Sequence, residues 1–127
     1  MSSFSDLLEN ELLDHVFRNA AYTSPSAVYL ALFTVTPSDA GGGTQVTGSG
    51  YARQAITFGA SSGGAIANTA AVAFTASGGS FGTVVAIGIF DAASSGNMLA
   101  WDEITSATVG DGDTITFAIG DIDITMT

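Results

Sequence analysis

The chain has 127 residues, of which 46% are hydrophobic and only 11% are charged, and its formal net charge is −10. Phosphate backbones are bound by Lys and Arg, and this chain has only two such residues, so the charge balance excludes nucleic acid and disfavours anionic membrane surfaces as partners. The absence of cysteine excludes disulfides and thiolate metal sites.

The length predicts a single domain over residues 1–127 that is large enough to bury a core. A charged fraction below half of the usual ~25% predicts a largely neutral surface, which suits close packing against other proteins. No apolar run approaches the ~18 residues of a membrane span. The acidic N-terminus lacks the basic segment of a signal peptide, so we expect the protein to be made in the cytoplasm.

The N-terminal segment predicts one amphipathic α-helix over residues 3–19. Its apolar side chains recur at spacings of three and four residues and so share one broad face: Phe4, Leu7, Leu8, Leu12, Leu13, Val16 and Phe17. Ser3 is the predicted N-cap, with Asp6 three positions later. Pro25 prevents the helix from continuing.

Residues 26–127 predict an antiparallel β-sandwich, which makes the expected fold mainly β. The segments 27–35 and 83–92 are apolar on both alternating faces, and the second segment places Val85 on the face of Ile87. Strands of this kind are covered on both sides, here by a second sheet and by either the helix or a neighbouring subunit. Near the C-terminus the apolar positions change phase at Gly120, which predicts a bulge or tight bend.

No catalytic, cofactor-binding or metal site is expected. Nucleophilic catalysis needs an activated nucleophile beside a base, but the chain has no Cys or Lys and its one histidine, His15, lies in the predicted helix. Asp111 and Asp113 sit in a glycine turn where aspartates could bind calcium, although the glutamate that ends a full calcium loop is missing. Asp121 and Asp123 fit the solvated face of an edge strand. A calcium- or carbohydrate-binding β-sandwich module is therefore a remote alternative.

Five motifs follow one another in a recognisable order: "LLDHVF", "VYLALFT", "YARQ", "GIFDA" and "GDGDTITF". Together they resemble a family of small bacteriophage virion structural proteins, often labelled phage tail fibre proteins, over nearly the whole chain. Gln45 stands where an acidic residue is common in that family, and Phe81 stands where tryptophan is expected. Each departure is expected to change a local contact and not the fold.

The resemblance implies a non-enzymatic virion protein that is made in the host cytoplasm and needs no cofactor. We favour a capsid decoration or cement protein that docks on the major capsid protein, because a neutral docking surface and an acidic outer surface suit that role. The alternative is a tail fibre, tail tip or tail adaptor subunit that contacts tail proteins. A homo-oligomer is expected, with a trimer favoured at three-fold positions of the shell.

Eight residues are the interface candidates: Phe4, Leu8, Leu12, Val16, Arg18, Tyr51, Arg53 and Asp91. The helix residues are expected either to dock on a neighbour or to close the core of their own chain, and the sequence does not decide between these. Arg53 is expected to pair with Asp91 inside the chain, in preference to reaching across a subunit interface.

Overall fold

The computed structural model describes residues 3–126, and it confirms a mainly β fold with antiparallel sheets and a short N-terminal helix. The elements in chain order are β1 (Ser3–Phe4), α1 (Asp6–Phe17), β2 (Val28–Val35), β3 (Thr44–Gln45), β4 (Gln54–Ile56), β5 (Ala65–Ala67), β6 (Val72–Thr75), β7 (Gly82–Phe90), β8 (Met98–Val109), β9 (Thr114–Phe117) and β10 (Asp123–Thr125).

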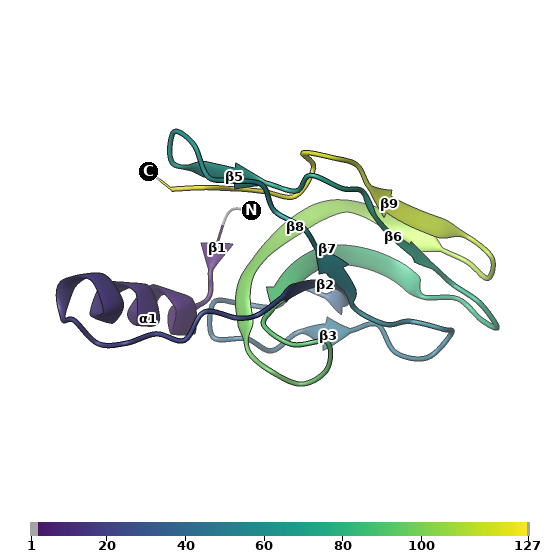
Figure 1. Ribbon diagram of the computed structural model, residues 1–127. Helices are drawn as coiled ribbons and strands as arrows, with labels where there is room; N and C mark the ends of the chain where they lie inside the picture. The colour runs from purple at the N-terminus through teal and green to yellow at the C-terminus, as the bar shows by residue number, and fades with distance from the viewer. Residues whose placement is uncertain (1–2, 127) are drawn as a thin grey trace.

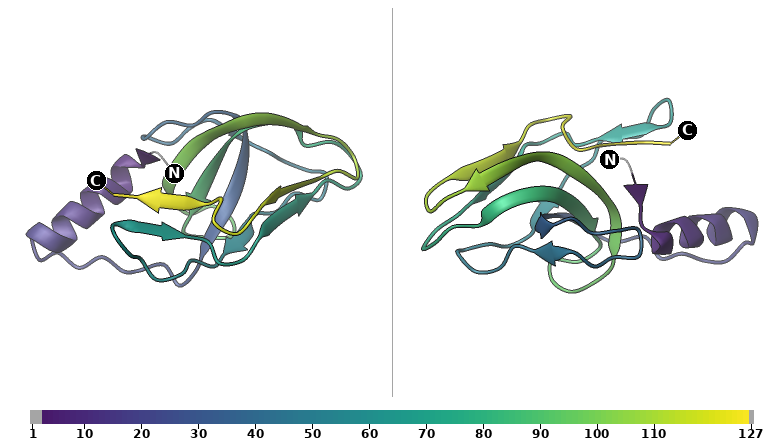
Figure 2. Two further views of the ribbon diagram at one scale, coloured as in Figure 1. Left: turned by 90° about the horizontal axis from the view of Figure 1, so that it is seen from above. Right: turned by 180° about the vertical axis from the view of Figure 1, so that it is seen from behind.

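One large sheet has the strand order β1-β8-β7-β2-β3, and β4 pairs with β2 beside β3. Two small ladders, β6 with β9 and β10 with β5, lie over one face of this sheet (Figures 1 and 2). The main core lies between these layers and consists of Leu30, Leu32, Val46, Ile56, Val72, Phe74, Ala76, Phe81, Val84, Ile87, Ile89, Val109, Phe117 and Ile122. The arrangement is that of a sandwich, because apolar residues of both layers fill one shared interior.

The opposite face of the large sheet is also buried, as the two-sided apolar pattern predicts. Ala31, Phe33, Ala86 and Met98 form a second apolar cluster there, with Val85, Phe90 and Trp101 packed against it. Gly88 makes room for this cover, since a Cβ at that position would lie 2.9 Å from Phe33 Cε1. The helix contributes no residue to this cluster or to the main core, and every residue of the cluster lies on β2, β7 or β8, so this face is covered by side chains of the sheet's own strands.

The predicted assignment of the β7 side chains to the two faces of the sheet is partly wrong. Val84 lies in the main core with Ile87 and Ile89, while Val85 packs on the outer cluster. The cause is a shift of register between Val84 and Ala86 in the pairing of β7 with β8. A bulge of this kind moves the residues before it to the opposite face.

The helix is shorter than the predicted 3–19, and its N-cap is Ser5, not Ser3. Ser3 and Phe4 pair with Trp101 and Ala100 of β8, and this ladder holds their backbone extended. The Ser5 side chain accepts a hydrogen bond from Leu8 N at 3.2 Å, as an N-cap does. The helix found in residues 3–126 lacks the length and apolar content that crossing a membrane requires.

The phase change near the C-terminus coincides with a turn at Gly120, as predicted, and Asn68 fixes that turn. Asn68 is 2% exposed, and its side-chain amide donates to Ala70 O at 2.8 Å and to Ala118 O at 3.0 Å. Its Oδ1 accepts from the backbone N–H groups of Gly120 and Ile122, both at 3.0 Å. One side chain thereby joins the two small ladders.

Replacing Asn68 with alanine should lower the free energy of unfolding by about 3 kcal/mol, because a buried side chain loses four hydrogen bonds to the backbone. Urea unfolding followed by circular dichroism measures this. Asn10→Ala, on the exposed side of α1, is the control and should stay within about 0.5 kcal/mol. Equal effects of the two substitutions would contradict the role given to Asn68.

Candidate functional site

Arg53 pins the turn between β7 and β8 to the sheet. Its Nη1 donates to Ala92 O at 2.9 Å and to Ser95 O at 2.7 Å, and its Nη2 donates to Gln45 Oε1 at 3.0 Å. The guanidinium carbon also lies 3.7 Å from the centre of the Phe90 ring. These contacts engage both Nη atoms and one face of the group with residues of its own chain.

The expected partner of Arg53 is corrected by the structure. Asp91 accepts hydrogen bonds from the backbone N–H of Asn97 at 2.7 Å and from its side-chain amide at 3.2 Å, and so closes the turn itself. Within residues 3–126 the hydrogen bonds of the Arg53 guanidinium go to two turn carbonyls and an amide, none to Asp91. Burial lowers the pKa of Arg53, and the charges of Tyr51 and Asp91 act in the opposite direction.

Tyr51 is a core residue with a polar end. Its ring stacks on the Phe74 ring with 6.0 Å between the ring centres, and it meets the Phe81 ring edge-on with 5.8 Å between the centres. The hydroxyl accepts from Leu32 N at 3.1 Å and from Gln45 Nε2 at 2.8 Å. Burial raises the pKa of Tyr51, while the hydrogen bonds from Leu32 and Gln45 and the charge of Arg53 lower it.

Gln45 is the residue that sequence reasoning missed. Its amide donates to Tyr51 and accepts from Arg53, which an ionised carboxylate at this position could not do because it only accepts. The unusual glutamine therefore links the two predicted residues. The signal in the sequence was Gln45 itself, where the resemblance implies an acidic residue, together with the scarcity of arginine.

The helix α1 projects from the sandwich, and none of its residues is buried (Figures 1 and 2). Leu13, Val16 and Phe17 are 56%, 64% and 79% exposed, although they are apolar. Leu8 and Leu12 are half-buried, as is Phe4 in β1. The helix thus does not close its own core, which was one of the two roles left open by the sequence.

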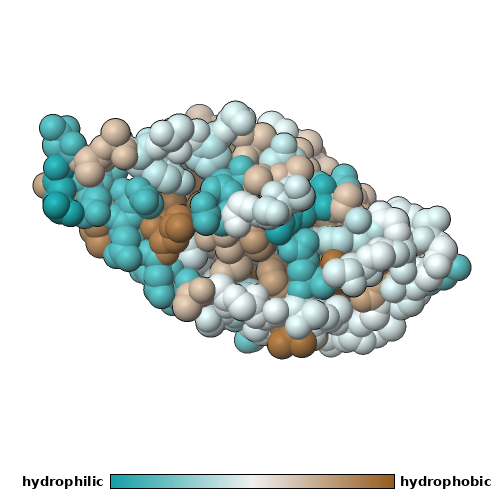
Figure 3. Space-filling view, turned by 90° about the horizontal axis from the view of Figure 1, so that it is seen from below, coloured by the Kyte–Doolittle hydropathy of each residue, from teal (hydrophilic) through white to brown (hydrophobic). Residues whose placement is uncertain are grey.

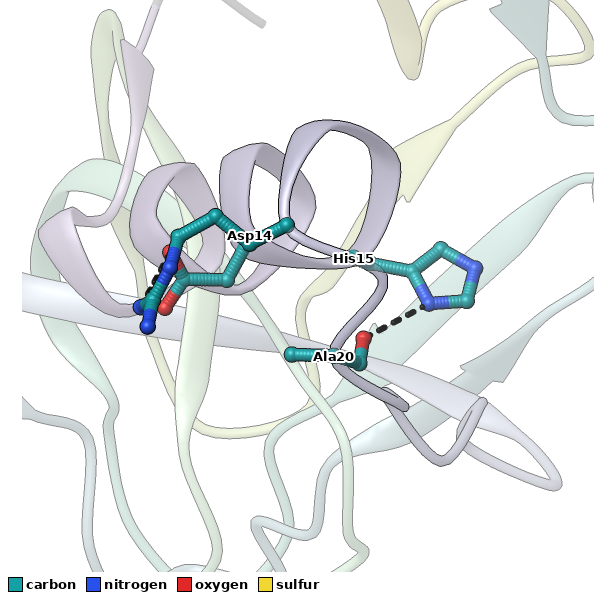
Figure 4. Close-up of polar contacts among 4 residues, drawn as sticks. Asp14, His15 and Ala20 are labelled. Carbon is teal, nitrogen blue, oxygen red and sulfur yellow. Dashed lines mark hydrogen bonds and ion pairs between the residues drawn. The ribbon is translucent and has the colours of Figure 1, made fainter.

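The end of α1 is held by polar contacts. Arg18 Nη1 lies 3.3 Å from Asp14 Oδ1, four residues earlier, in an exposed ion pair. The Nδ1 of His15 lies 3.1 Å from the carbonyl oxygen of Ala20, so a proton on Nδ1 would be donated to it (Figure 4). Arg18 and His15 therefore both stabilise the C-terminal end of the helix. Neither contact covers the apolar face of α1.

Beside that open face lies a hollow of about 200 Å³ lined by Phe4, Glu9, Leu12, Leu13 and Met126. We call it the α1 groove. Met126 follows β10, so the C-terminal segment forms the wall opposite the helix. The space-filling view in Figure 3 shows hydrophobic and strongly hydrophilic residues side by side at the end of the molecule that carries α1. Much of the opposite end has intermediate hydropathy.

Three carboxylates gather at the start of α1. Asp6, Glu9 and Asp39 bring their oxygens within 4.8 Å of one another, and in residues 3–126 this is the one place where three such groups meet. Asp39 also accepts from Trp101 Nε1 at 2.8 Å, and its carbonyl accepts from Asp6 N at 2.9 Å. We call these three residues the acidic cluster. Sequence reasoning did not anticipate it.

Asp111 and Asp113, which were considered for calcium, and the nearby Asp121 all accept hydrogen bonds from backbone N–H groups. Asp113 accepts from Gly110 N at 2.9 Å, Asp111 accepts from Gly78 N at 3.1 Å, and Asp121 accepts from Ala118 N at 2.9 Å. Asp113 and Asp121 close their own turns, as aspartates commonly do, while Asp111 joins its turn to the loop at Gly78. The geometry therefore gives each of them a structural task.

Fold and surfaces define a small β-sandwich with a projecting amphipathic helix. The chain belongs to the family described as Podophage GP4 fiber I protein gp80, which matches residues 3–125. The protein is therefore a member of a bacteriophage virion structural family, as the resemblance of its motifs predicts. No curated protein matches the sequence.

Arg53→Ala should lower the free energy of unfolding by about 2 kcal/mol, since charge-assisted hydrogen bonds to three acceptors are lost. Arg18→Ala removes the only other arginine, and it should change stability by less than about 0.5 kcal/mol because its ion pair is exposed. Chemical denaturation of both variants measures the difference. Limited proteolysis should also cut residues 91–97 faster in Arg53→Ala alone. Equal stability of the two variants would contradict the pinning role.

Tyr51 should make the protein less stable at alkaline pH. The folded chain holds the phenol proton more tightly than the unfolded chain, so this stability is fully present below the ordinary tyrosine pKa of 10.0 and is lost as pH rises through the raised folded value. Tyr51→Phe should cost about 1–2 kcal/mol at neutral pH, because Leu32 N loses its acceptor. The variant should also lose less stability between about pH 9 and 11 in urea titrations. An unchanged alkaline slope would contradict this assignment.

Proposed function

We propose that the protein is a non-enzymatic subunit of a fibre on the phage particle, attached to a neighbouring virion protein through α1. The observation that carries the proposal is the combination of a fibre-protein family with a helix whose apolar face its own core leaves open. An exposed apolar face of this kind commonly marks a site of contact with another protein.

The polar residues support a structural role. Arg53, Asp91, Asp111, Asp113 and His15 all make hydrogen bonds that hold turns or a helix end. Groups engaged in this way are not poised as nucleophile and base. Their arrangement favours a passive building block over a hydrolase.

A capsid decoration protein is the second candidate. It is favoured by the low charged fraction and by the broad surface of intermediate hydropathy in Figure 3, which suit flat contacts repeated over a shell. Many weak contacts of this kind hold firmly when they act together. In that role the major capsid protein would be the partner, and for a fibre subunit the partner would be a tail protein.

A trimer remains our prediction for the assembled protein in either role, because closed symmetry fits both a fibre and a three-fold position on a shell. Light scattering of the purified chain at several concentrations measures its mass. A mass that stays at one chain up to high concentration would show that any trimer needs the particle to form.

The number of copies per particle separates the two candidates. Quantitative mass spectrometry of purified particles, relative to the major capsid protein, should give a ratio far below one for a fibre subunit. A ratio near one would replace the fibre by the decoration role. Complete absence of the chain from the particles would contradict both.

A further inference from the structure

The α1 groove and the acidic cluster form one continuous surface. Glu9 belongs to both, lining the groove with Leu12 and Leu13 and meeting Asp6 and Asp39 in the cluster. An apolar hollow therefore ends in three close carboxylates. A single elongated ligand could contact both parts at once.

In residues 3–126, neither arginine is directed to this surface. The chain has only these two Lys or Arg residues, and Arg53 is committed to the turn between β7 and β8. Arg18 lies at the other end of α1 and pairs with Asp14 at 3.3 Å. Three like charges this close repel one another, and a ligand that brought positive charge would relieve that repulsion.

A second copy of the chain suits this surface poorly. It would bring its own three carboxylates and a net charge of −10 toward an identical cluster. A partner segment of opposite charge avoids this repulsion.

We propose that this surface binds an amphipathic helical segment of a different virion protein, with apolar side chains in the α1 groove and Lys or Arg side chains on the acidic cluster. The inference rests on the proposed function, since it takes the partner to be a virion component. Charge complementarity gives the contact its specificity and orientation, while the groove supplies the apolar area.

Two designed peptides test the chemistry with the purified full-length chain. They share one leucine pattern and are about 18 residues long so that each can form a helix, but one carries lysine and the other glutamate on its polar face. Fluorescence anisotropy should show binding of the lysine peptide at least about tenfold tighter than binding of the glutamate peptide. Added salt should weaken it. Equal binding of the two peptides, or binding of neither, would overturn the proposal.

Variants separate specific docking from general attraction to an acidic protein. One double variant replaces Leu13 of the groove and the exposed Phe17 of the same helix with serine, and the other is Asp6→Asn with Glu9→Gln. Each should weaken binding of the lysine peptide about tenfold or more. Ile119→Ser, which changes another exposed apolar residue outside the groove, should leave binding unchanged. Uniform affinity across the three variants would contradict a site at α1. All substituted positions are exposed, so the variants should keep the parent's melting temperature.

A photo-reactive phenylalanine analogue at position 17 identifies the natural occupant in assembled particles. The expected cross-link joins α1 to a segment of another virion protein that carries Lys or Arg beside apolar residues. A cross-link to a second copy of this chain, or to an acidic segment, would overturn the inference. The peptide experiment does not depend on where the chain sits in the particle, so its outcome is independent of the copy-number test.

Discussion

The structure depends on the pairing of β2 with β7, two neighbouring strands that are apolar on both faces. Such a pair is stable only when both faces are covered, and the chain supplies both covers itself. The two small ladders close one face around Leu30 and Leu32, while Phe33 and Met98 close the other. Arg53, just before β4, holds the turn between β7 and β8 in place. It donates to two carbonyl oxygens of that turn and lies over the Phe90 ring.

A core completed in this way leaves α1 without an internal task. A helix of 12 residues is marginal on its own in water, and this one is supported by the Ser5 cap, by contacts at its C-terminal end and by the short pairing of β1 with β8. Its exposed apolar face and the acidic cluster at its start are features of a contact surface. The sandwich acts as the platform, and α1 with the adjoining C-terminal segment acts as the docking element.

Features set by local pattern could be predicted from the sequence, and those set by distant contacts could not. The two-sided burial of β2 and β7, the presence of one helix and the turn at Gly120 follow from periodicity and glycine placement. The helix start was misplaced because β1 pairs with β8, almost a hundred residues away. The link of Gln45 to Tyr51 and Arg53 also depends on contacts made in the folded chain, and no local pattern predicts it. The same holds for Asp39, which the loop after β2 brings close to Asp6.

Hydrogen–deuterium exchange, followed peptide by peptide in the free chain and in purified particles, tests the central claim that α1 is held by a partner and not by its own core. Amides of α1 should exchange far faster than those of β2 and β7 in the free chain, because no α1 residue is buried. The same amides should become protected in the particle. Protection of α1 equal to that of β2 in the free chain, with no change on assembly, would show that α1 is held by its own chain and not by a partner.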